Sequence, residues 1–346
     1  MRRFVFLLFL IAVPLTAGAA TPGAKAALAV ADGFVVPHYR ALAAAADAQA
    51  RAWDLFCKGH ARGQEQALRA AYRALADRWA EIEFVKTGPI VLFLRAERFD
   101  YWPEVRNATQ RNLDALLASN DPNALAPATL AHDSVPAQGL PAIERLLYDA
   151  AYARHPKRCV IGQAVARNLA SIAHGVLAEW TAPNGARAAI AADKGWNNNI
   201  FAGADEAGRM LLTDLVSAFA ALNDRKLLAP LGASLAAAKP RAAEAWRSGR
   251  SARDLALNLA AMHEMVKFFA AGISAPARAR LDRVFAGAEA AVKALPPDIG
   301  AAAANPVLRA KLVAARAAIK SAQAETLAIL PAALNLSVGF NALDGD

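Results

Sequence analysis

The chain has 346 residues, of which 56% are hydrophobic and only 7% are aromatic. Alanine and leucine are abundant and β-branched residues are sparse, which favours helices because alanine loses no side-chain entropy on entering one. This composition excludes a β-sandwich or barrel, and the high apolar content excludes intrinsic disorder. The formal net charge is +9. The arginines are spread along the chain and not clustered, so we expect a solvated basic surface and no nucleic-acid partner.

The first 20 residues have the pattern of a secretory signal peptide. Arg2 and Arg3 precede an apolar run from Phe4 to Leu15, and the small residues Ala17-Gly18-Ala19 supply a cleavage site. The alternative is an N-terminal core helix. We expect residues 1–20 to direct export and the mature protein to be periplasmic, to associate with the cell envelope and to have no transmembrane segment.

The rest of the chain is predicted to be helical, because apolar residues repeat at steps of three and four positions. The predicted helices cover residues 38–57, 64–85, 106–118, 139–150, 158–180, 204–222, 252–270, 275–294 and 306–330. A stretch rich in Gly and Asn, residues 183–203, is the candidate connection between an N-terminal half (21–182) and a C-terminal half (204–346). Similar Arg- and Trp-containing stretches, 95–113 and 246–259, suggest pseudo-symmetry between these halves. The predicted fold class is all-α, with two helical-bundle halves.

The chain contains two cysteines, Cys57 and Cys159. In an oxidising compartment an even number of cysteines suggests a disulfide bond. The alternative is a pair of buried thiols. A bond between them would close a loop of about a hundred residues and would contribute ~4 kcal/mol if the effect is one of chain entropy.

Common catalytic motifs are absent from the sequence, which has no HExxH, CxxC, Walker loop, GxSxG or GxGxxG. It has six histidines, and none of them has another histidine three or four residues away. No helix face therefore presents a ready-made pair of histidine ligands for a metal ion.

Two glutamates, Glu83 and Glu144, lie beside apolar positions of predicted helices and are the candidate functional carboxylates. A carboxylate that faces the core needs a cation, because a buried lone charge is costly. Arg95 and Arg98 are the natural partners, and we expect Glu83, Arg95, Trp102 and Glu144 to converge. Such a network is either purely structural or the lining of a ligand-binding or catalytic cleft, and the residues alone leave both interpretations open.

The stretch Gly139–Tyr148 (GLPAIERLLY) resembles the central motif of the imelysin family, which are bacterial envelope proteins classed as metallopeptidases. Residues 339–346 (GFNALDGD) are similar to the ending of that family. Glu83 with Gly88-Pro89, and Tyr101-Trp102-Pro103, are further matches. The resemblance covers nearly the whole mature chain and implies a helical protein of two bundle-like halves with a cleft between them.

The signature of that family is Gly-x-His-x-x-Glu, which is linked to metal binding and to iron-regulated envelope functions. Here it reads Gly139 to Glu144 with Pro141 at the histidine position. Proline offers no ligand atom, so the metal site loses a donor. A metal held by Glu83 and Glu144 would have oxygen ligands, which suit iron or calcium better than zinc. The residues expected to line the ligand-binding cleft are Glu83, Arg95, Trp102, Gln138, Gly139 and Glu144.

Three functions are compatible with these observations. The first is an imelysin-like periplasmic protein that is not a peptidase and binds a small ligand or an envelope protein in a role linked to iron uptake or regulation. The second is a metallopeptidase of the imelysin type, against which the missing histidine argues. The third is a purely structural envelope protein, against which the density of Arg, Trp and Glu argues. The first is the predicted function.

Overall fold

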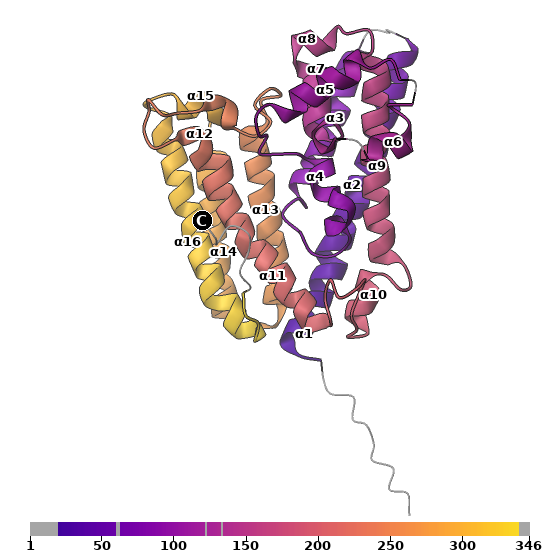
Figure 1. The fold of residues 1–346 in the computed structure, drawn as a ribbon. Coiled ribbons are helices and arrows are strands. Elements are labelled where there is room, and N and C mark those ends of the chain that lie inside the picture. The colour runs from indigo at the N-terminus through magenta and orange to yellow at the C-terminus, as the bar shows by residue number, and fades with distance from the viewer. Residues whose placement is uncertain (1–19, 60–62, 122, 133, 339–346) are drawn as a thin grey trace, which may run out of the picture.

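A computed structural model describes residues 20–338 except 60–62, 122 and 133 (Figure 1). Throughout this part of the chain the regular structure is helical, and a bridge between Trp196 and Phe201 is isolated and belongs to no sheet. The predicted all-α fold class is therefore confirmed. Residues 1–19 of the predicted signal peptide, and the C-terminal motif 339–346, lie outside the described residues.

The N-terminal half is built on three long helices. Helix α2 (Val36–Lys58) packs along both α3 (Gln64–Ala80) and α9 (Arg158–Thr181), and its Trp53 is fully buried. Shorter helices contact α9, namely α4 (Arg95–Phe99), α6 (Pro127–His132), α7 (Leu140–Tyr148) and α10 (Ala186–Ala191), and α7 also contacts α3. Helices α5 (Ala108–Ala118) and α8 (Ala150–Ala153) pack against α7.

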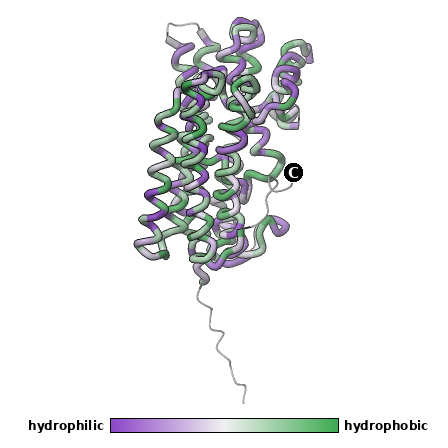
Figure 2. Tube along the Cα trace, turned by 90° about the vertical axis from the view of Figure 1, so that its left-hand side faces the viewer, coloured by the Kyte–Doolittle hydropathy of each residue, from purple (hydrophilic) through white to green (hydrophobic). Residues whose placement is uncertain are grey.

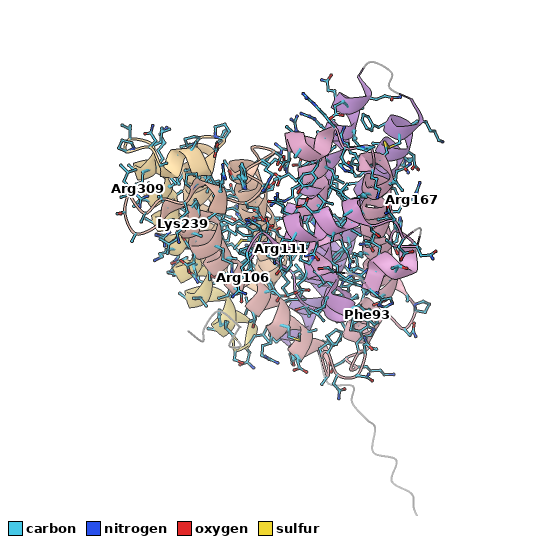
Figure 3. All side chains as sticks on the ribbon, turned by 45° about the horizontal axis from the view of Figure 1, so that its top comes forward. Phe93, Arg106, Arg111, Arg167, Lys239 and Arg309 are labelled. Atoms are coloured by element: carbon cyan, nitrogen blue, oxygen red, sulfur yellow. A yellow bond between two sulfur atoms is a disulfide. The ribbon has the colours of Figure 1, made fainter. Side chains whose placement is uncertain are left out.

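A disulfide bond joins the end of α2 to the start of α9. Cys57 and Cys159 have Cα atoms 5.6 Å apart, within the range that a disulfide requires. The predicted pairing is therefore confirmed. The two helices approach closely here, since a Cβ atom on Gly162 would lie 2.5 Å from the ring of Trp53. Side chains fill the space between the helices throughout both halves (Figure 3).

The C-terminal half contains four long helices, which are α11 (Ala204–Ala220), α13 (Ser251–Phe269), α14 (Ala275–Lys293) and α16 (Arg309–Leu334). Helix α14 packs between α13 and α16, and α11 contacts α13 and α16. The short helices α12 (Ala229–Leu231) and α15 (Ile299–Ala303) contact each other at one end of this bundle (Figure 1).

The N-terminal helix links the two bundles. Helix α1 (Pro22–Val30) runs through a π-helical stretch, Ala31–Val35, directly into α2. It packs mainly against α11 and α13 of the C-terminal half, whereas α2 belongs to the N-terminal half. The contact with α11 needs small residues, because a Cβ atom on Gly208 would lie 2.8 Å from the carbonyl oxygen of Gly23.

Several predicted elements differ from the structure. The helix expected over 139–150 is divided at Asp149 into α7 and α8. The helix expected over 64–85 ends at Ala80, because Ile82 and Val85 donate backbone hydrogen bonds three residues back and form tight turns. The connection 183–203 contains the helix α10. The helix expected over 204–222 continues beyond Ala220 as a π-helical segment, η4 (Ala221–Leu228).

Hydrophobic and hydrophilic residues alternate along the helices of both bundles (Figure 2). Among the described residues, no helix combines the length and the apolar character that crossing a membrane requires.

Candidate functional site

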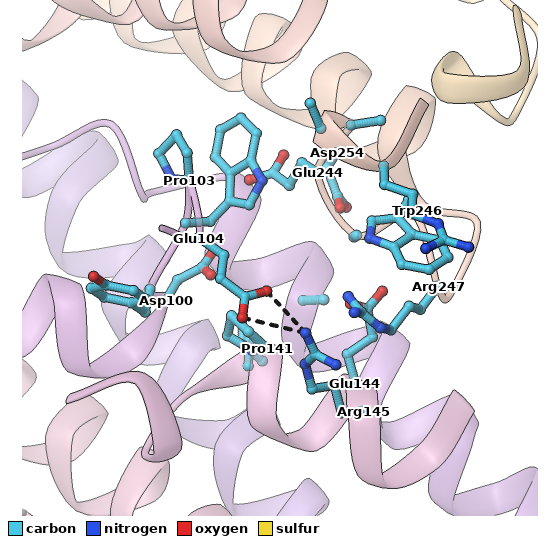
Figure 4. A pocket seen from close by; sticks show the side chains of 18 of the residues that line it. Asp100, Pro103, Glu104, Pro141, Glu144, Arg145, Glu244, Trp246, Arg247 and Asp254 are labelled. Carbon is cyan, nitrogen blue, oxygen red and sulfur yellow. Dashed lines mark hydrogen bonds and ion pairs between the residues drawn. The ribbon is translucent and has the colours of Figure 1, made fainter. Parts of the chain in front are cut away.

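A cavity of about 600 Å³ lies between the two halves (Figure 4). The N-terminal half contributes α3, the start of α7 and the segment 100–110. The C-terminal half contributes residues 224–229 and 241–254. The lining thus combines segments that are more than a hundred residues apart in the sequence.

Three of the six predicted cleft residues line this cavity, namely Glu83, Trp102 and Glu144. Glu83 lies in the turn that follows α3. Pro141 and Glu144 are three positions apart on α7 and therefore share one helix face, which borders the cavity. The signature segment identified in the sequence is thus part of the cavity wall.

The predicted convergence of Arg95 on Glu83 and Glu144 is wrong. The two terminal nitrogens of Arg95 donate to the carboxylate of Glu179 on α9, at 2.6 and 2.9 Å. The turn before α4 explains this direction, because Phe93 and Leu94 adopt left-handed backbone conformations with φ of 56° and 54°. The turn leaves Phe93 on the surface (Figure 3) and starts α4 with Arg95 facing α9 and not the cavity.

Gln138 and Gly139 support the site without lining it. The side-chain oxygen of Gln138 accepts a 2.7 Å hydrogen bond from Nε of Arg98, and Arg98 also donates to Asn168 at 3.1 Å. Gly139 allows close packing, since a Cβ atom there would lie 2.5 Å from the carbonyl oxygen of Phe99. Both contacts fix the start of α7 and thereby the positions of Pro141 and Glu144.

The cation beside Glu83 is Lys226, which was not among the predicted site residues. Its ammonium group donates to Glu83 at 2.5 Å and also to Glu244. It lies 5.6 Å from the centre of the Trp102 ring, in the range of a cation–π contact. Lys226 is 4% exposed and follows Leu222 by four positions, so it continues the buried face of α11 into η4. That position was the available signal in the sequence.

Glu83, Asp100 and Glu244 place carboxylate oxygens within 4.8 Å of one another. Burial, and then the charge of Glu83, raise the pKa of Asp100 to about 7. Burial also raises the pKa of Glu244 well above its ordinary value, against the opposing effect of Lys226. Protons therefore persist on this group of acids at pH values where ordinary carboxyl groups are ionised.

Glu144 forms a contact between the halves. One of its carboxylate oxygens accepts hydrogen bonds from the backbone N–H of Ser248 at 2.9 Å and from its hydroxyl at 2.6 Å. Glu144 is 5% exposed, and burial raises its pKa although both Ser248 bonds act in the opposite direction. The carboxylate of the signature segment therefore takes part in a contact between the two halves.

The residues present do not fit a resident metal ion. Pro141 has no donor atom, and Glu144 is not among the described carboxylates that meet within metal-binding distance. Two of the three carboxylates that do meet, Glu83 and Glu244, already share the ammonium group of Lys226. Lys226 thus supplies the positive charge that a metal would bring to these acids.

The segment 241–247 forms a basic and aromatic part of the wall (Figure 4). The guanidinium carbons of Arg247 and Arg241 lie 4.3 and 5.4 Å from the centre of the Trp246 ring. Burial, and then the charge of Arg145, lower the pKa of Arg247. Arg145 is 2% exposed and pairs with Glu104 at 3.1 Å. Trp102 and Trp246, one from each of the two similar Arg- and Trp-containing stretches, both line the cavity.

The chain is similar to one known protein family and to solved structures. A model of the family described as imelysin (peptidase M75) matches residues 35–326. The solved structure of an imelysin-like protein from Psychrobacter arcticum 273-4 is 21% identical, has a TM-score of 0.77, and is matched over 96% of this chain and 100% of that one. Among curated proteins, none matches the sequence.

A second solved structure is that of a protein assigned as an iron-regulated protein A precursor from Parabacteroides distasonis ATCC 8503. It is 15% identical, has a TM-score of 0.72, and is matched over 92% of this chain and 97% of that one. At these identities the two structures support the fold.

Proposed function

Because the chain belongs to the imelysin family, we propose that its cavity binds a ligand in an exported, periplasmic protein with a role in iron uptake or regulation, and that it is not a peptidase active site. One observation carries the proposal. Pro141 stands where the family signature has histidine, and it borders the cavity one helical turn from Glu144. The name of the relative from P. distasonis supports the link to iron, and residues 1–20 support export.

A zinc peptidase needs a set of protein ligands with one open position, which is filled by a water molecule that becomes the nucleophile. The cavity offers carboxylates without a histidine, and a lysine ammonium lies among them. Glu144 would be the expected general base, but it accepts two hydrogen bonds from Ser248. These features argue against the alternative of an imelysin-type metallopeptidase.

Binding is the activity that the cavity supports best. A volume of about 600 Å³ is typical of sites that enclose a small molecule. Its wall combines indole rings, carboxylates and guanidinium groups, which can orient a polar ligand. This concave shape favours a small ligand over the surface of another envelope protein.

The proposal predicts the outcome of restoring the signature with Pro141→His. The matched control is Pro276→His, because Pro276 is the second residue of α14, as Pro141 is of α7, and is exposed on the surface. In titration calorimetry with zinc, we expect Pro141→His to bind at least about tenfold more tightly than the parent, since one ligand adds more than ~1.4 kcal/mol. Pro276→His should match the parent.

The same three proteins are then incubated with zinc and denatured casein. The parent should leave casein intact, and zinc-dependent cleavage by the parent would establish the peptidase alternative. If Pro141→His bound zinc no better than Pro276→His, the remaining carboxylates would have to be interpreted as a structural ion network.

A further inference from the structure

The acidic part of the cavity has more carboxyl groups than cations to pair with them. Glu83, Asp100 and Glu244 lie close together, and the ammonium group of Lys226 pairs with Glu83 and Glu244. Asp100 forms no ion pair with any described residue and accepts a 2.9 Å hydrogen bond from the indole N–H of Trp79. This part of the wall can therefore accept another positive charge or hydrogen-bond donor.

The basic part of the wall has the opposite imbalance. Arg241 and Arg247 lie against Trp246, and within the described chain neither forms an ion pair or a hydrogen bond. The nearby acids have other partners, since Glu104 forms an ion pair with Arg145 and Glu144 accepts a hydrogen bond from Ser248. An indole ring keeps a planar guanidinium in place and leaves its N–H groups free to bond a carboxylate in bidentate fashion.

The basic part of the wall also contains a buried hydrogen-bond donor that lacks an acceptor among the described residues. Arg145 lines the cavity and is 2% exposed, and its Nε–H has no hydrogen-bond acceptor among the described residues. Figure 4 shows Arg145, Trp246 and Arg247 on one side of the cavity, with Asp100 on the other side. The two parts of the wall thus have opposite charge and face a common space.

The charge pattern restricts the class of ligand. A polyanion would be repelled by the carboxyl groups, and a polycation by the guanidinium groups, whereas an apolar molecule would leave both unpaired. A ligand with one charge of each sign at its two ends satisfies both parts. The volume of about 600 Å³ is larger than a single amino acid requires and suits a short chain of them.

We propose that the cavity binds a short peptide with free termini, with its ammonium group at Asp100 and Glu244 and its carboxylate at Arg241 and Arg247. This inference rests on the proposed function, because it requires a cavity that binds a peptide without cleaving it. It adds the chemical class of the ligand and its direction in the cavity. The indole rings of Trp102 and Trp246, which also line the cavity, suit an apolar or aromatic side chain.

The test is calorimetry with three forms of the tripeptide Ala-Phe-Ala: with free termini, with an acetylated N-terminus, and with an amidated C-terminus. The assay is run at pH 7.5, between the pKa of Asp100, which is about 7, and that of a peptide ammonium group, which is about 8, so that both groups are mainly charged. We expect the free form to bind, and each blocked form to bind at least about tenfold more weakly, because each block removes one charged contact.

Variants of this chain assign each end of the peptide. Arg247→Met should bind the free and amidated forms equally, yet still discriminate against the acetylated form. Asp100→Asn should bind the free and acetylated forms equally, yet still discriminate against the amidated form. Arg51→Met is the matched control, since Arg51 is an exposed arginine of α2 outside the cavity lining, and this variant should behave like the parent.

Equal binding of the free and blocked forms by the parent would overturn the proposal, and so would equal losses in Arg51→Met and Arg247→Met. Absence of tripeptide binding, with casein left intact, would overturn the peptide ligand but not the binding function. Zinc-dependent cleavage of casein by the parent would overturn the binding function itself.

Discussion

At the scale of single residues, sequence reasoning located carboxylates better than their partners. Glu83 and Glu144 were identifiable because each lies beside apolar positions in the sequence, and both line the cavity. The partners were not identifiable from spacing. Lys226 is 143 positions from Glu83, and Ser248 is 104 positions from Glu144, so these pairs form only when the two halves pack together.

Loss of Lys226 should show how much the buried acids depend on it. In Lys226→Met, Glu83 and Glu244 lose their shared cation while remaining largely buried, which should lower the free energy of unfolding by ~3–5 kcal/mol. Lys320→Met is the control, because Lys320 is an exposed lysine of α16. Urea unfolding at pH 7 measures the free energy of unfolding of both variants. Equal stabilities of the two variants would show that the acids are neutralised by protons alone.

The ion pair of Arg95 should contribute less to stability than the ion pairs of Lys226. Its ion pair with Glu179 is more exposed than the pairs of Lys226, with the Glu179 side chain 35% exposed. Solvent screens such a pair and can solvate the glutamate that remains if the arginine is removed. The stabilising role that sequence reasoning assigned to Arg95 therefore belongs to Lys226.

At the scale of elements, apolar periodicity predicted where helices lie better than where they end. The helix predicted over 275–294 matches α14, Ala275–Lys293. The apolar repeat in 64–85 continued past the true helix end, because Ile82 and Val85 are buried in tight turns as well as they would be in a helix. The π-helical segments were not predictable, since one added residue per turn leaves no local signal in an alanine-rich sequence.

The disulfide bond is an element-level constraint whose effect follows from the loop that it closes. Cys57 and Cys159 are 102 residues apart, so the bond should restrict the unfolded chain strongly. The double variant Cys57→Ser/Cys159→Ser should be less stable by ~4 kcal/mol. Urea unfolding of this variant against the oxidised parent checks the value. A parent that loses no stability on complete reduction would contradict the prediction.

At the scale of the whole molecule, contacts between the halves define the cavity. Arg250 and Arg253 of the C-terminal half both pair with Asp77 on α3, at 2.5 and 2.6 Å. Asn258 of α13 donates to Glu83 at 2.8 Å, so the same surface that joins the halves also orients the cavity acids. Sequence reasoning predicted two helical halves, but which faces meet depends on packing over the full length of the chain.

This arrangement makes the stability of the whole molecule dependent on pH. Burial raises the pKa of Asp100 to about 7 and that of Asp254 to about 6. When the folded state has the higher pKa, it binds more protons than the unfolded chain, so the contribution to stability is complete below about pH 4 and is lost as the pH rises to 7. Asp77 acts in the opposite direction, because its arginine partners outweigh burial and lower its pKa.

Asp100→Asn isolates one of these groups, since asparagine is uncharged like the protonated carboxyl and can still accept the hydrogen bond from Trp79. At pH 4 the variant and the parent should be nearly equally stable. At pH 8 the parent carries a charge that burial disfavours, so the variant should be more stable by about 2 kcal/mol, allowing for the partial exposure of Asp100. Glu97→Gln, at an exposed position, should change stability equally at both pH values. Urea unfolding at pH 4 and pH 8 gives all the values, and a variant-to-parent difference that is the same at both would show that the pKa of Asp100 does not differ between the folded and unfolded states.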